Sequence, residues 1–486
     1  MTVSEGVAKF VKDVTFQKIP AFTLQKLKEQ LYSLIGSMYA GSKTHAGNVI
    51  IETVMKEFSG GDGKLATIIP NGNKVPFKEA VTVNAATAMA LDYDDYLFLG
   101  HTGVSSVPVS LALAENYKLS GKEFLTLQAI GNEVAGRVGA AAVIGPLNGQ
   151  CWSFIHLASS ACMTAKVLDL SVEQIVNAIG IAMTHWTFTA FRSFMGPHAK
   201  LFTSAVPCRI GMEAAYFAAY GMTGAPDVFE SPTGPLSFYA YTPLPFLIDN
   251  SLGEAWVTDT ISFKIYPGCG YIDPIADCIG KILEKTGPDF NYQDIEKVRI
   301  KASVVSIFMD DLSRPYVTQK ELKRSRSHVA LNFYVPYNVA IMLMDGKLTP
   351  EQFTEEKYTD PEVWKLAEKI KTEIDLDLTR RTTGLIAKLT PENRDLKLVD
   401  LGLSEFKVEW GAKVVVQMKD GTKLKAKQLQ PIGTPGVPYA IENKLRQEAL
   451  YIKMGDSQIN KIIETVKNFE KLESIHEFID LITLKS

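Results

Sequence analysis

Residues 77–91 are small and apolar on nearly every side of a helix, and three carboxylates follow almost at once. A helix that is apolar all round must be buried, so the segment predicts a central helix in a helical domain. Its end carries Asp92, Asp94 and Asp95, and His101 follows after an aromatic segment. The helix dipole opposes carboxylates at this end, so they cost stability unless cations or hydrogen bonds compensate. The acidic cluster is therefore a candidate functional site, although each residue alone also fits a solvated loop.

The first half of the chain is dominated by helical patterns. Asn71-Gly72 predicts the turn of a short hairpin, and Ser171 to Gln174 has the spacing of a capping box. Apolar spacing and small-residue content predict further helices over residues 45–58, 107–117, 122–143 and 211–220. The first ~250 residues therefore predict a packed all-helical domain.

The pattern changes near residues 262–267, after which strand-like runs appear. Residues 297–304 alternate polar and apolar side chains, and Asp420-Gly421 predicts the turn between strands 413–418 and 422–426. Prolines at positions 350 and 361 fit the first turns of two helices, and residues 442–451 and 457–472 return to a helical pattern. We predict a mainly α protein with a smaller α+β lid: an all-helical domain over 1–258, the lid over 259–435, and helices over 436–486 that pack back on the first domain.

The composition is that of an ordinary soluble protein. Hydrophobic residues make up 46%, charged residues 22%, and the formal net charge is -3, so no nucleic acid or membrane partner is expected. The N-terminus shows no secretion signal and no apolar run reaches membrane-spanning length, which predicts a cytoplasmic location. Five scattered cysteines without a CxxC pair favour buried free thiols over a metal site. The usual cofactor fingerprints are absent, so we expect no cofactor and side-chain acid-base chemistry if the protein is an enzyme.

Two lysines lie in glycine- and proline-broken segments. Lys200 and His198 belong to the loop 192–200, and Lys264 and Cys269 belong to a turn at the predicted domain boundary. A lysine in a partly dry cleft can act as a base or stabilise a developing anion, and clefts between domains favour binding. Exposed lysines with no role in a site are the alternative for both.

Tyr337 and His156 are weaker candidates. The Tyr337 hydroxyl can bind a substrate oxygen, but aromatic residues of this kind are more often packing. His156 precedes a small-residue helix, where a buried histidine with satisfied hydrogen bonds is the more common interpretation.

Taken in order, several segments resemble the MmgE/PrpD family, which includes 2-methylcitrate dehydratases, cis-aconitate decarboxylase and iminodisuccinate epimerase. The resemblance runs from about Leu24 to Leu481, and the ordered series is more specific than any single motif. The matching segments are 83–85, 91–95, 131–139, 200–211, 221–224, 264–267, 335–340, 345–346 and 420–421. It implies a large helical domain with a smaller α+β lid, in homodimers whose active site lies between the domains.

Carried over by residue, the resemblance implies an active-site aspartate at Asp92, a histidine at His101, lysines at Lys200 and Lys264, and a tyrosine at Tyr337. The implied reaction is cofactor-free proton abstraction next to a carboxylate of a small di- or tricarboxylic acid. Elimination, decarboxylation or reprotonation then decides the product. Cationic lysines would stabilise the carbanion-like intermediate.

The sequence departs from the family around the expected substrate pocket. Tyr96 stands where a threonine is usual, and Cys269 stands where the lid supplies a histidine in other members. A glycine-aromatic-histidine segment is replaced by one that contains Gln150 and Ser153, so its histidine is absent unless His156 replaces it. We therefore expect Tyr96, Gln150, Ser153, His156, His198, Lys264 and Cys269 to contact the substrate, and Asp92, His101, Lys200 and Tyr337 to act in catalysis.

Three functional hypotheses follow. The first is a lyase of the 2-methylcitrate dehydratase type. The second is an epimerase or a decarboxylase acting on a related carboxylic acid, which the missing histidines favour. The third is a non-catalytic protein that binds a carboxylate.

Overall fold

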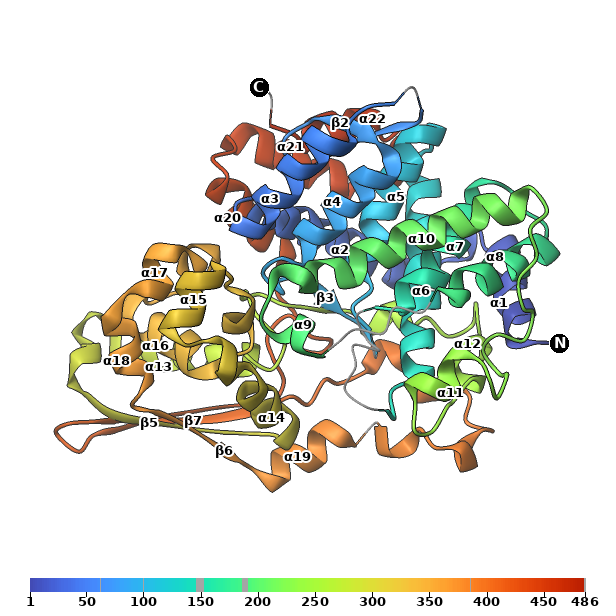
Figure 1. The fold of residues 1–486 in the computed structure, drawn as a ribbon. Coiled ribbons are helices and arrows are strands. Elements are labelled where there is room, and N and C mark those ends of the chain that lie inside the picture. Colours follow the sequence, from blue (N-terminus) through green and yellow to red (C-terminus); the bar gives the residue numbers. More distant parts are fainter. Residues whose placement is uncertain (62, 99, 146–152, 186–190, 385, 485–486) are drawn as a thin grey trace.

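The computed structural model describes residues 1–61, 63–98, 100–145, 153–185, 191–384 and 386–484 of the 486-residue chain. It has a large helical part and a smaller part with a sheet (Figure 1). The helices of the first half are α1 (Val3–Asp13), α2 (Ala21–Ser42), α3 (His45–Thr53), α4 (Phe77–Met89), α5 (Gly103–Tyr117), α6 (Gly121–Ala141), α7 (Ile155–Val167), α8 (Val172–Thr184), α9 (Phe191–Met195), α10 (Phe202–Ala219), α11 (Pro235–Tyr239) and α12 (Phe246–Asp249).

Helix α4 lies at the centre of the helical part, as its composition predicts. It packs against α2, α5 and α10, and every residue from Ala80 to Met89 is buried. Small residues allow the close approach: a Cβ on Gly41 of α2 would lie 1.8 Å from the carbonyl oxygen of Thr87. The helix is therefore fixed by its neighbours on all sides, and so is the position of its C-terminal end.

Several local predictions are confirmed. The Asn71-Gly72 turn joins β1 (Leu65–Thr67) to β2 (Lys74–Pro76) in an antiparallel pair. The capping box at Ser171 opens α8. The helix predicted over residues 45–58 is α3, continued by a π-helical turn, η2 (Val54–Phe58).

The smaller part is built on a four-stranded sheet of order β6-β5-β7-β8. The strands are β5 (Ile295–Ala302), β6 (Ile370–Ile374), β7 (Ala412–Met418) and β8 (Lys423–Gln428); β5 is parallel to β6 and antiparallel to β7. The predicted hairpin at Asp420-Gly421 is confirmed as β7–β8. Its helices are α13 (Asp273–Thr286), α14 (Val304–Ser313), α15 (Gln319–Ser325), α16 (Val335–Asp345), α17 (Glu355–Thr359), α18 (Pro361–Ala367) and α19 (Leu376–Thr383).

The C-terminal helices α20 (Ile441–Tyr451), α21 (Asp456–Lys467) and α22 (His476–Leu481) return to the helical part, beside the N-terminal helices (Figure 1). Helix α20 packs on α2, and two α2 tyrosines bind carbonyls of the C-terminal region: Tyr32 donates to Ile463 O at 2.7 Å and Tyr39 to Ile482 O at 2.8 Å. The exact domain boundaries given above stay predictions. Within the described ranges, no helix has the length and apolar character needed to span a membrane.

A two-residue strand pair brings the acidic segment to the later part of the chain. Strand β3 (Asp95–Tyr96) runs antiparallel to β4 (Ser262–Phe263), with Asp95 opposite Phe263 and Tyr96 opposite Ser262. Figure 1 shows β3 near the middle of the molecule, where the two parts meet. The predicted acidic cluster therefore lies at the junction of the two parts.

Candidate active site

Helix α4 ends just before the acidic cluster, in a turn that places Asp92 in an unusual backbone conformation. Its φ is +50°, in the left-handed region that non-glycine residues enter at a cost of about 1–3 kcal/mol. The Asp92 amide donates to Met89 O at 2.9 Å, which closes the helix end. The turn directs the chain into β3 and leaves the Asp92 side chain buried, with 2% of its surface exposed.

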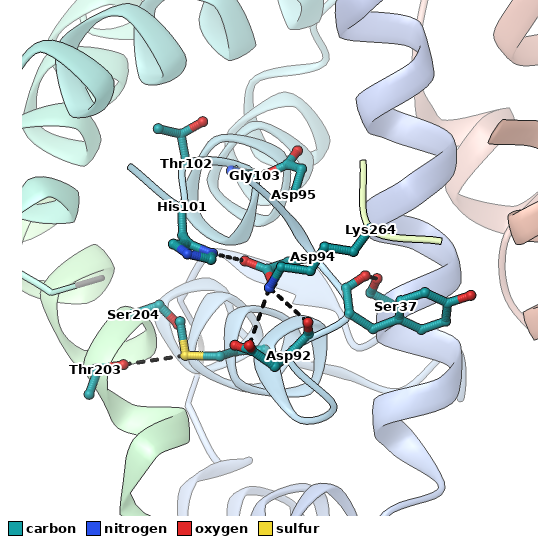
Figure 2. A network of polar contacts seen from close by, with 12 residues as sticks. Ser37, Asp92, Asp94, Asp95, His101, Thr102, Gly103, Thr203, Ser204 and Lys264 are labelled. Carbon is teal, nitrogen blue, oxygen red and sulfur yellow. Dashed lines mark hydrogen bonds and ion pairs between the residues drawn. The ribbon is translucent and has the colours of Figure 1, made fainter. Parts of the chain in front are cut away.

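Lys264 is delivered by the β3–β4 pairing. Asp94 precedes β3 and Lys264 follows β4, so the antiparallel register sets them opposite each other, and the Lys264 amide lies 3.4 Å from Asp94 O. Lys264 Nζ donates to Asp94 Oδ1 at 2.7 Å and to the backbone oxygen of Asp92 at 2.7 Å, and it lies 3.3 Å from Asp92 Oδ2. Figure 2 shows the ammonium between the two carboxylates. Lys264 therefore ties the two aspartates together.

Lys200 approaches from the start of α10. It lies in the short 3₁₀ helix η3 (His198–Leu201), and its Nζ donates to Asp92 Oδ1 at 2.6 Å. The same nitrogen lies 5.2 Å from the ring centre of Phe194 and 4.7 Å from that of Phe333, within the range of cation–π attraction. Lys200 is fully buried, so the alternative of an exposed lysine is wrong for it, as it is for the fully buried Lys264.

His101 is oriented by Asp94. Its Nδ1 lies 2.9 Å from Asp94 Oδ2, on the carboxylate that also binds Lys264 (Figure 2). A carboxylate accepts from the imidazole N–H, so Nδ1 carries the proton and Nε2 has the lone pair of the neutral ring. The arrangement is an aspartate–histidine pair suited to proton transfer.

The charges of the cluster set its titration. Burial alone would raise the pKa of Asp92, but Lys200 and Lys264 outweigh it and hold that pKa below its usual value. Burial likewise opposes ionisation of Asp94, yet Lys264 and His101 lower its pKa strongly. Burial lowers the pKa of His101 more than Asp94 raises it, so the imidazole stays neutral below its ordinary pKa. The cluster thus holds two carboxylates, two ammonium groups and a neutral histidine.

Asp95 has a different role. Its Oδ1 accepts a hydrogen bond from Gly103 N at 3.0 Å, at the first residue of α5, and it points away from Lys264 (Figure 2). Burial and the nearby Asp94 charge raise the Asp95 pKa to about 7. Asp95 therefore holds the start of the next helix, while Asp92 and Asp94 hold the lysines.

Two of the residues expected to contact substrate lie beside the cluster. Burial, followed by the Asp92 charge, raises the pKa of the Cys269 thiol to about 12, while Lys264 and Lys200 act in the opposite direction. The Tyr96 ring is 6.2 Å from the ring of His101 and stacks on Trp410 at 5.5 Å. Trp410 comes from the segment before β7, so both parts of the molecule contribute to this side of the cluster.

The described contacts of three other predicted site residues are with groups outside the cluster, and a fourth residue lies outside the described residues. His156 is buried on α7 with Nδ1 2.8 Å from Ser105 Oγ, and Ser153 lies just before that helix and is buried. His198 Nε2 is 3.3 Å from Arg326 O, and its ring is 5.5 Å from that of His45. Gln150 lies outside the described residues, so its predicted contact with substrate stays a prediction.

Tyr337 is not brought to the cluster. It is buried on α16, its hydroxyl donates to Gln352 O, and its ring packs against Phe353 and Trp364 at 6.0 and 5.9 Å. The geometry is that of a packing residue inside the smaller part, which is the alternative raised from its sequence context. A catalytic role for Tyr337 has no support in this arrangement.

Three residues around the site were not among the individual site residues predicted from sequence. Asp94 belongs to the acidic segment but was given no role of its own, and it is a member of the ion-pair cluster. His328 is buried with Nε2 2.7 Å from Ala90 O, and Asn332 is buried with no hydrogen bond to its side-chain amide among the described residues. Asn332 O accepts from the Cys269 amide at 2.8 Å, which sets it close to the same turn. Neither His328 nor Asn332 has a local pattern that would distinguish it from a loop residue.

Among the residues that the structure describes, no group of three or more His, Cys, Asp or Glu side chains is arranged to hold a metal ion. The described chemistry of the cluster is that of charged and acid-base side chains.

Three relatives resemble most of the chain at low identity. Human cis-aconitate decarboxylase is 24% identical over an alignment that covers 97% of this chain and 92% of the relative. The probable 2-methylcitrate dehydratase of Saccharomyces cerevisiae is 22% identical, over 92% of this chain and 82% of the relative. A mouse cis-aconitate decarboxylase is 24% identical over 76% of each chain.

The two parts of the molecule each match one domain of a known family. Residues 5–244 match the MmgE/PrpD N-terminal domain, which covers most of the helical part. Residues 266–467 match the MmgE/PrpD C-terminal domain, which covers the sheet and its helices and reaches into α21. The ordered motifs, the fold and both domain matches agree, and the chain belongs to the MmgE/PrpD family.

Proposed function

We propose that this protein is a lyase that acts on a small di- or tricarboxylic acid and removes a proton from the carbon next to a carboxylate. The observation that carries the proposal is the buried cluster in which Asp94 orients His101 beside Lys200 and Lys264. The names of the relatives add the chemical class: one is a decarboxylase and another a probable dehydratase, both of tricarboxylic acids. Elimination of water, as in the 2-methylcitrate dehydratase type, is our first choice of product.

In the proposed reaction, His101 takes the proton. Its Nε2 lone pair is the base, since Nδ1 is bound to Asp94. Asp94 keeps the ring in this tautomer and stabilises the imidazolium that forms, while Lys264 prevents Asp94 from accepting the proton itself. The imidazolium can then protonate the leaving hydroxyl or the product carbon.

Lys200 and Lys264 stabilise the negative charge that develops on the substrate. Both are fully buried, and an ammonium in a dry site stabilises an anion more than it would in water. Asp92 holds both lysines in place before substrate arrives, through contacts of 2.6 and 3.3 Å. A substrate carboxylate would share these lysines with Asp92.

Because the two lysines are already balanced by two aspartates, a polyanionic substrate needs neutral donors as well. The buried Asn332 amide has no hydrogen-bond partner in the described portion of the chain, and Tyr96 stands beside His101. Burial raises the pKa of the fully buried Asp273 well above its usual value, which favours the protonated form that can donate a hydrogen bond. We assign these three groups to the remaining substrate oxygens.

Decarboxylation is the second candidate, since the human decarboxylase aligns with 97% of this chain, more than the yeast dehydratase does. Both reactions place negative charge on carbon beside a carboxylate, where the lysines can stabilise it. In dehydration a base removes a proton from carbon and hydroxide leaves, whereas in decarboxylation carbon dioxide leaves and the carbon then takes a proton from an acid. An epimerase would use proton transfer alone, and a carboxylate-binding protein would use none of it. A homodimer and a cytoplasmic location also stay predictions.

One experiment separates these outcomes. The protein is incubated in heavy water with 2-methylcitrate, citrate, cis-aconitate and an aminodicarboxylic acid, and alkene formation, carbon dioxide release and deuterium uptake are followed. Alkene formation supports the dehydratase, carbon dioxide the decarboxylase, and deuterium uptake alone the epimerase. If none of the probes is turned over, the result supports the hypothesis of a non-catalytic protein that binds a carboxylate.

A matched pair of histidine variants ties the activity to the cluster. His101→Asn should lower the rate about 10²- to 10⁴-fold, the usual contribution of a general base. His476→Asn, on α22 with its Nδ1 2.9 Å from Ser474 Oγ, should leave it unchanged. A fully active His101→Asn enzyme would remove His101 from the mechanism.

A further inference from the structure

A third buried lysine, Lys444 of the C-terminal helix α20, contacts the acidic segment. Only 2% of Lys444 is exposed, and its ammonium donates to the backbone oxygen of Tyr93, the residue between Asp92 and Asp94. The same nitrogen lies 3.9 Å from the centre of the Tyr93 ring. Lys444 thus binds both the backbone and the side chain of the residue between the two aspartates.

Helix α2 completes the binding of this carbonyl. Ser37 Oγ lies 2.6 Å from Tyr93 O and donates to it. Lys444 Nζ also donates to Ser33 Oγ at 2.8 Å and to Ser37 Oγ at 3.2 Å. Two helices that are more than 400 residues apart in the chain therefore meet on one backbone oxygen.

Every carbonyl of the segment Asp92-Tyr93-Asp94 is fixed by a lysine. Asp92 O binds Lys264 Nζ, Tyr93 O binds Lys444 Nζ, and Asp94 O faces the Lys264 amide at 3.4 Å. The Tyr93 hydroxyl donates to Ile265 O at 3.0 Å, beside Lys264. The backbone that presents both catalytic-cluster aspartates is therefore held on the α20 side by Lys444 and on the β4 side by Lys264.

Burying Lys444 and Glu448 costs folding free energy. Burial lowers the pKa of Lys444, against the attraction of Glu448, Asp94 and Asp95. Neither Glu448 oxygen has a hydrogen bond within the described residues, and burial raises the Glu448 pKa to about 8. An apolar side chain of similar size would fill the same space without desolvating a charge. A lysine here supplies the contact with Tyr93 O, and Asp92 beside it is strained at φ +50° and needs surrounding contacts to stay so.

We propose that Lys444 is a positioning residue of the active site, which holds the Asp92–Asp94 backbone so that Asp92 meets the two lysines and Asp94 meets His101. The inference rests on the proposed function for its kinetic consequences. It does not require Lys444 to touch the substrate. Small displacements of catalytic groups lower the rate of the chemical step. Substitution of Lys444 should therefore lower kcat more than it changes KM.

The test compares Lys444→Met with Arg446→Met on the same helix, using whichever of cis-aconitate and 2-methylcitrate is turned over. We expect kcat to fall about tenfold or more in Lys444→Met with KM within about threefold, and no change in Arg446→Met. Arg446 donates to Asn460 Oδ1 at 2.6 Å and pairs with Asp456 at 3.5 Å, and both partners belong to α21. Unchanged kcat in a folded Lys444→Met enzyme would overturn the proposal, as would an effect on KM alone.

Ser37→Ala keeps the proposal testable if Lys444→Met fails to fold. It removes one of the two side-chain donors to Tyr93 O while Lys444 remains, so we expect a fall in kcat of about threefold at unchanged KM. A Ser37→Ala enzyme with the kcat of the parent would count against a positioning role for this contact.

Hydrogen exchange gives a readout that needs no substrate. Amides of residues 91–97 should exchange faster in Lys444→Met and Ser37→Ala than in the parent protein. In Arg446→Met they should exchange at the rate of the parent. If the parent turns over neither probe, the proposed function fails while this comparison still decides the positioning role. Equal exchange in all four proteins would overturn it.

Discussion

The Glu133–Arg137 pair and the acidic cluster at Asp92 are both buried ion-pair networks, and they differ in how completely their polar atoms are satisfied. On α6, Glu133 accepts from Arg137 Nε at 3.1 Å, Val257 N at 3.1 Å, and both the amide and hydroxyl of Thr258 at 2.9 and 2.7 Å. Arg137 donates its other nitrogens to Asn250 O and Ala255 O. At the acidic cluster, Asp92 Oδ2 has an ion contact with Lys264 but no hydrogen bond within the described chain.

The difference indicates what each network does. Buried polar groups in folded proteins are normally hydrogen-bonded, and exceptions call for an explanation such as a catalytic role. The Glu133–Arg137 pair satisfies its charges with fixed backbone groups, which suits a structural tie between α6 and residues 250–258. The Asp92 cluster keeps strain and an incompletely bound carboxylate at the junction of the two parts. Both segments belong to the matching family motifs, so motif membership alone does not separate structure from catalysis.

The largest expected effect is on stability, at the satisfied network. Arg137→Met would leave Glu133 buried without its cation, and breaking such a pair costs about 3–5 kcal/mol of unfolding free energy. Urea denaturation measures the loss, and kcat per folded molecule should stay unchanged. The Glu133→Gln/Arg137→Met double variant should recover part of the stability, since no charge is left unpaired. A lower kcat at full stability would break the comparison.

At the acidic cluster, for which a catalytic role is proposed, the expected effect moves from stability to rate. Lys200→Met keeps a side chain of similar length against Phe194 and Phe333 but removes the ammonium. We expect kcat to fall about 10²- to 10³-fold, or ~2.7–4 kcal/mol in the barrier, as for loss of one charge-stabilising donor. Steady-state kinetics at matched folded concentration measures it.

A matched control for this variant is Lys26→Met. Lys26 also lies near an aromatic ring, 5.4 Å from the centre of Phe263, but its ion pair is with Glu29. Its substitution should leave kcat unchanged. Equal losses of kcat in the two variants would mean that the activity depends on contact with an aromatic ring and not on the Lys200 ammonium beside Asp92.

The pH dependence tests the state of His101. Burial lowers its pKa more than Asp94 raises it, so protonation of the base begins below the ordinary value of 6.5. The value of kcat/KM should therefore be constant between pH 6.5 and neutral pH, and it should decrease only below pH 6.5. Asp94→Asn removes the charge that favours the imidazolium, so it should move the limb to still lower pH while reducing the rate. An acid limb above 6.5 would contradict a neutral buried base.

The fold was predictable where local patterns carry it. The apolar helix at 77–89, the two glycine turns and the capping box at Ser171 each depend on a few neighbouring residues. The four-stranded order β6-β5-β7-β8 was not predictable, because β6 pairs with β5 across the long segment from Ala302 to Ile370, with no local signal for the pairing.

The site was predictable where family-like motifs carry its residues. Asp92, His101, Lys200 and Lys264 follow from the motifs, and the structure brings all four together. The roles of Asp94 and Asp95 depend on which way successive side chains point after the α4 turn, which a left-handed residue at 92 decides. Lys444 gives no sequence signal at all, since an isolated lysine in an amphipathic helix usually faces water.

The smallest expected effect is at an exposed pair. Lys365 and Glu362 on α18 lie 3.7 Å apart with 71% and 55% of their side chains exposed. Lys365→Met should change the unfolding free energy by no more than about 0.5 kcal/mol, because water and salt screen such pairs. Urea denaturation of this variant beside Arg137→Met measures both on one scale. If the exposed pair cost as much as the buried one, the loss in Arg137→Met could not be assigned to an uncompensated buried charge, and hydrogen-bond satisfaction would no longer distinguish the α6 network from the cluster at Asp92.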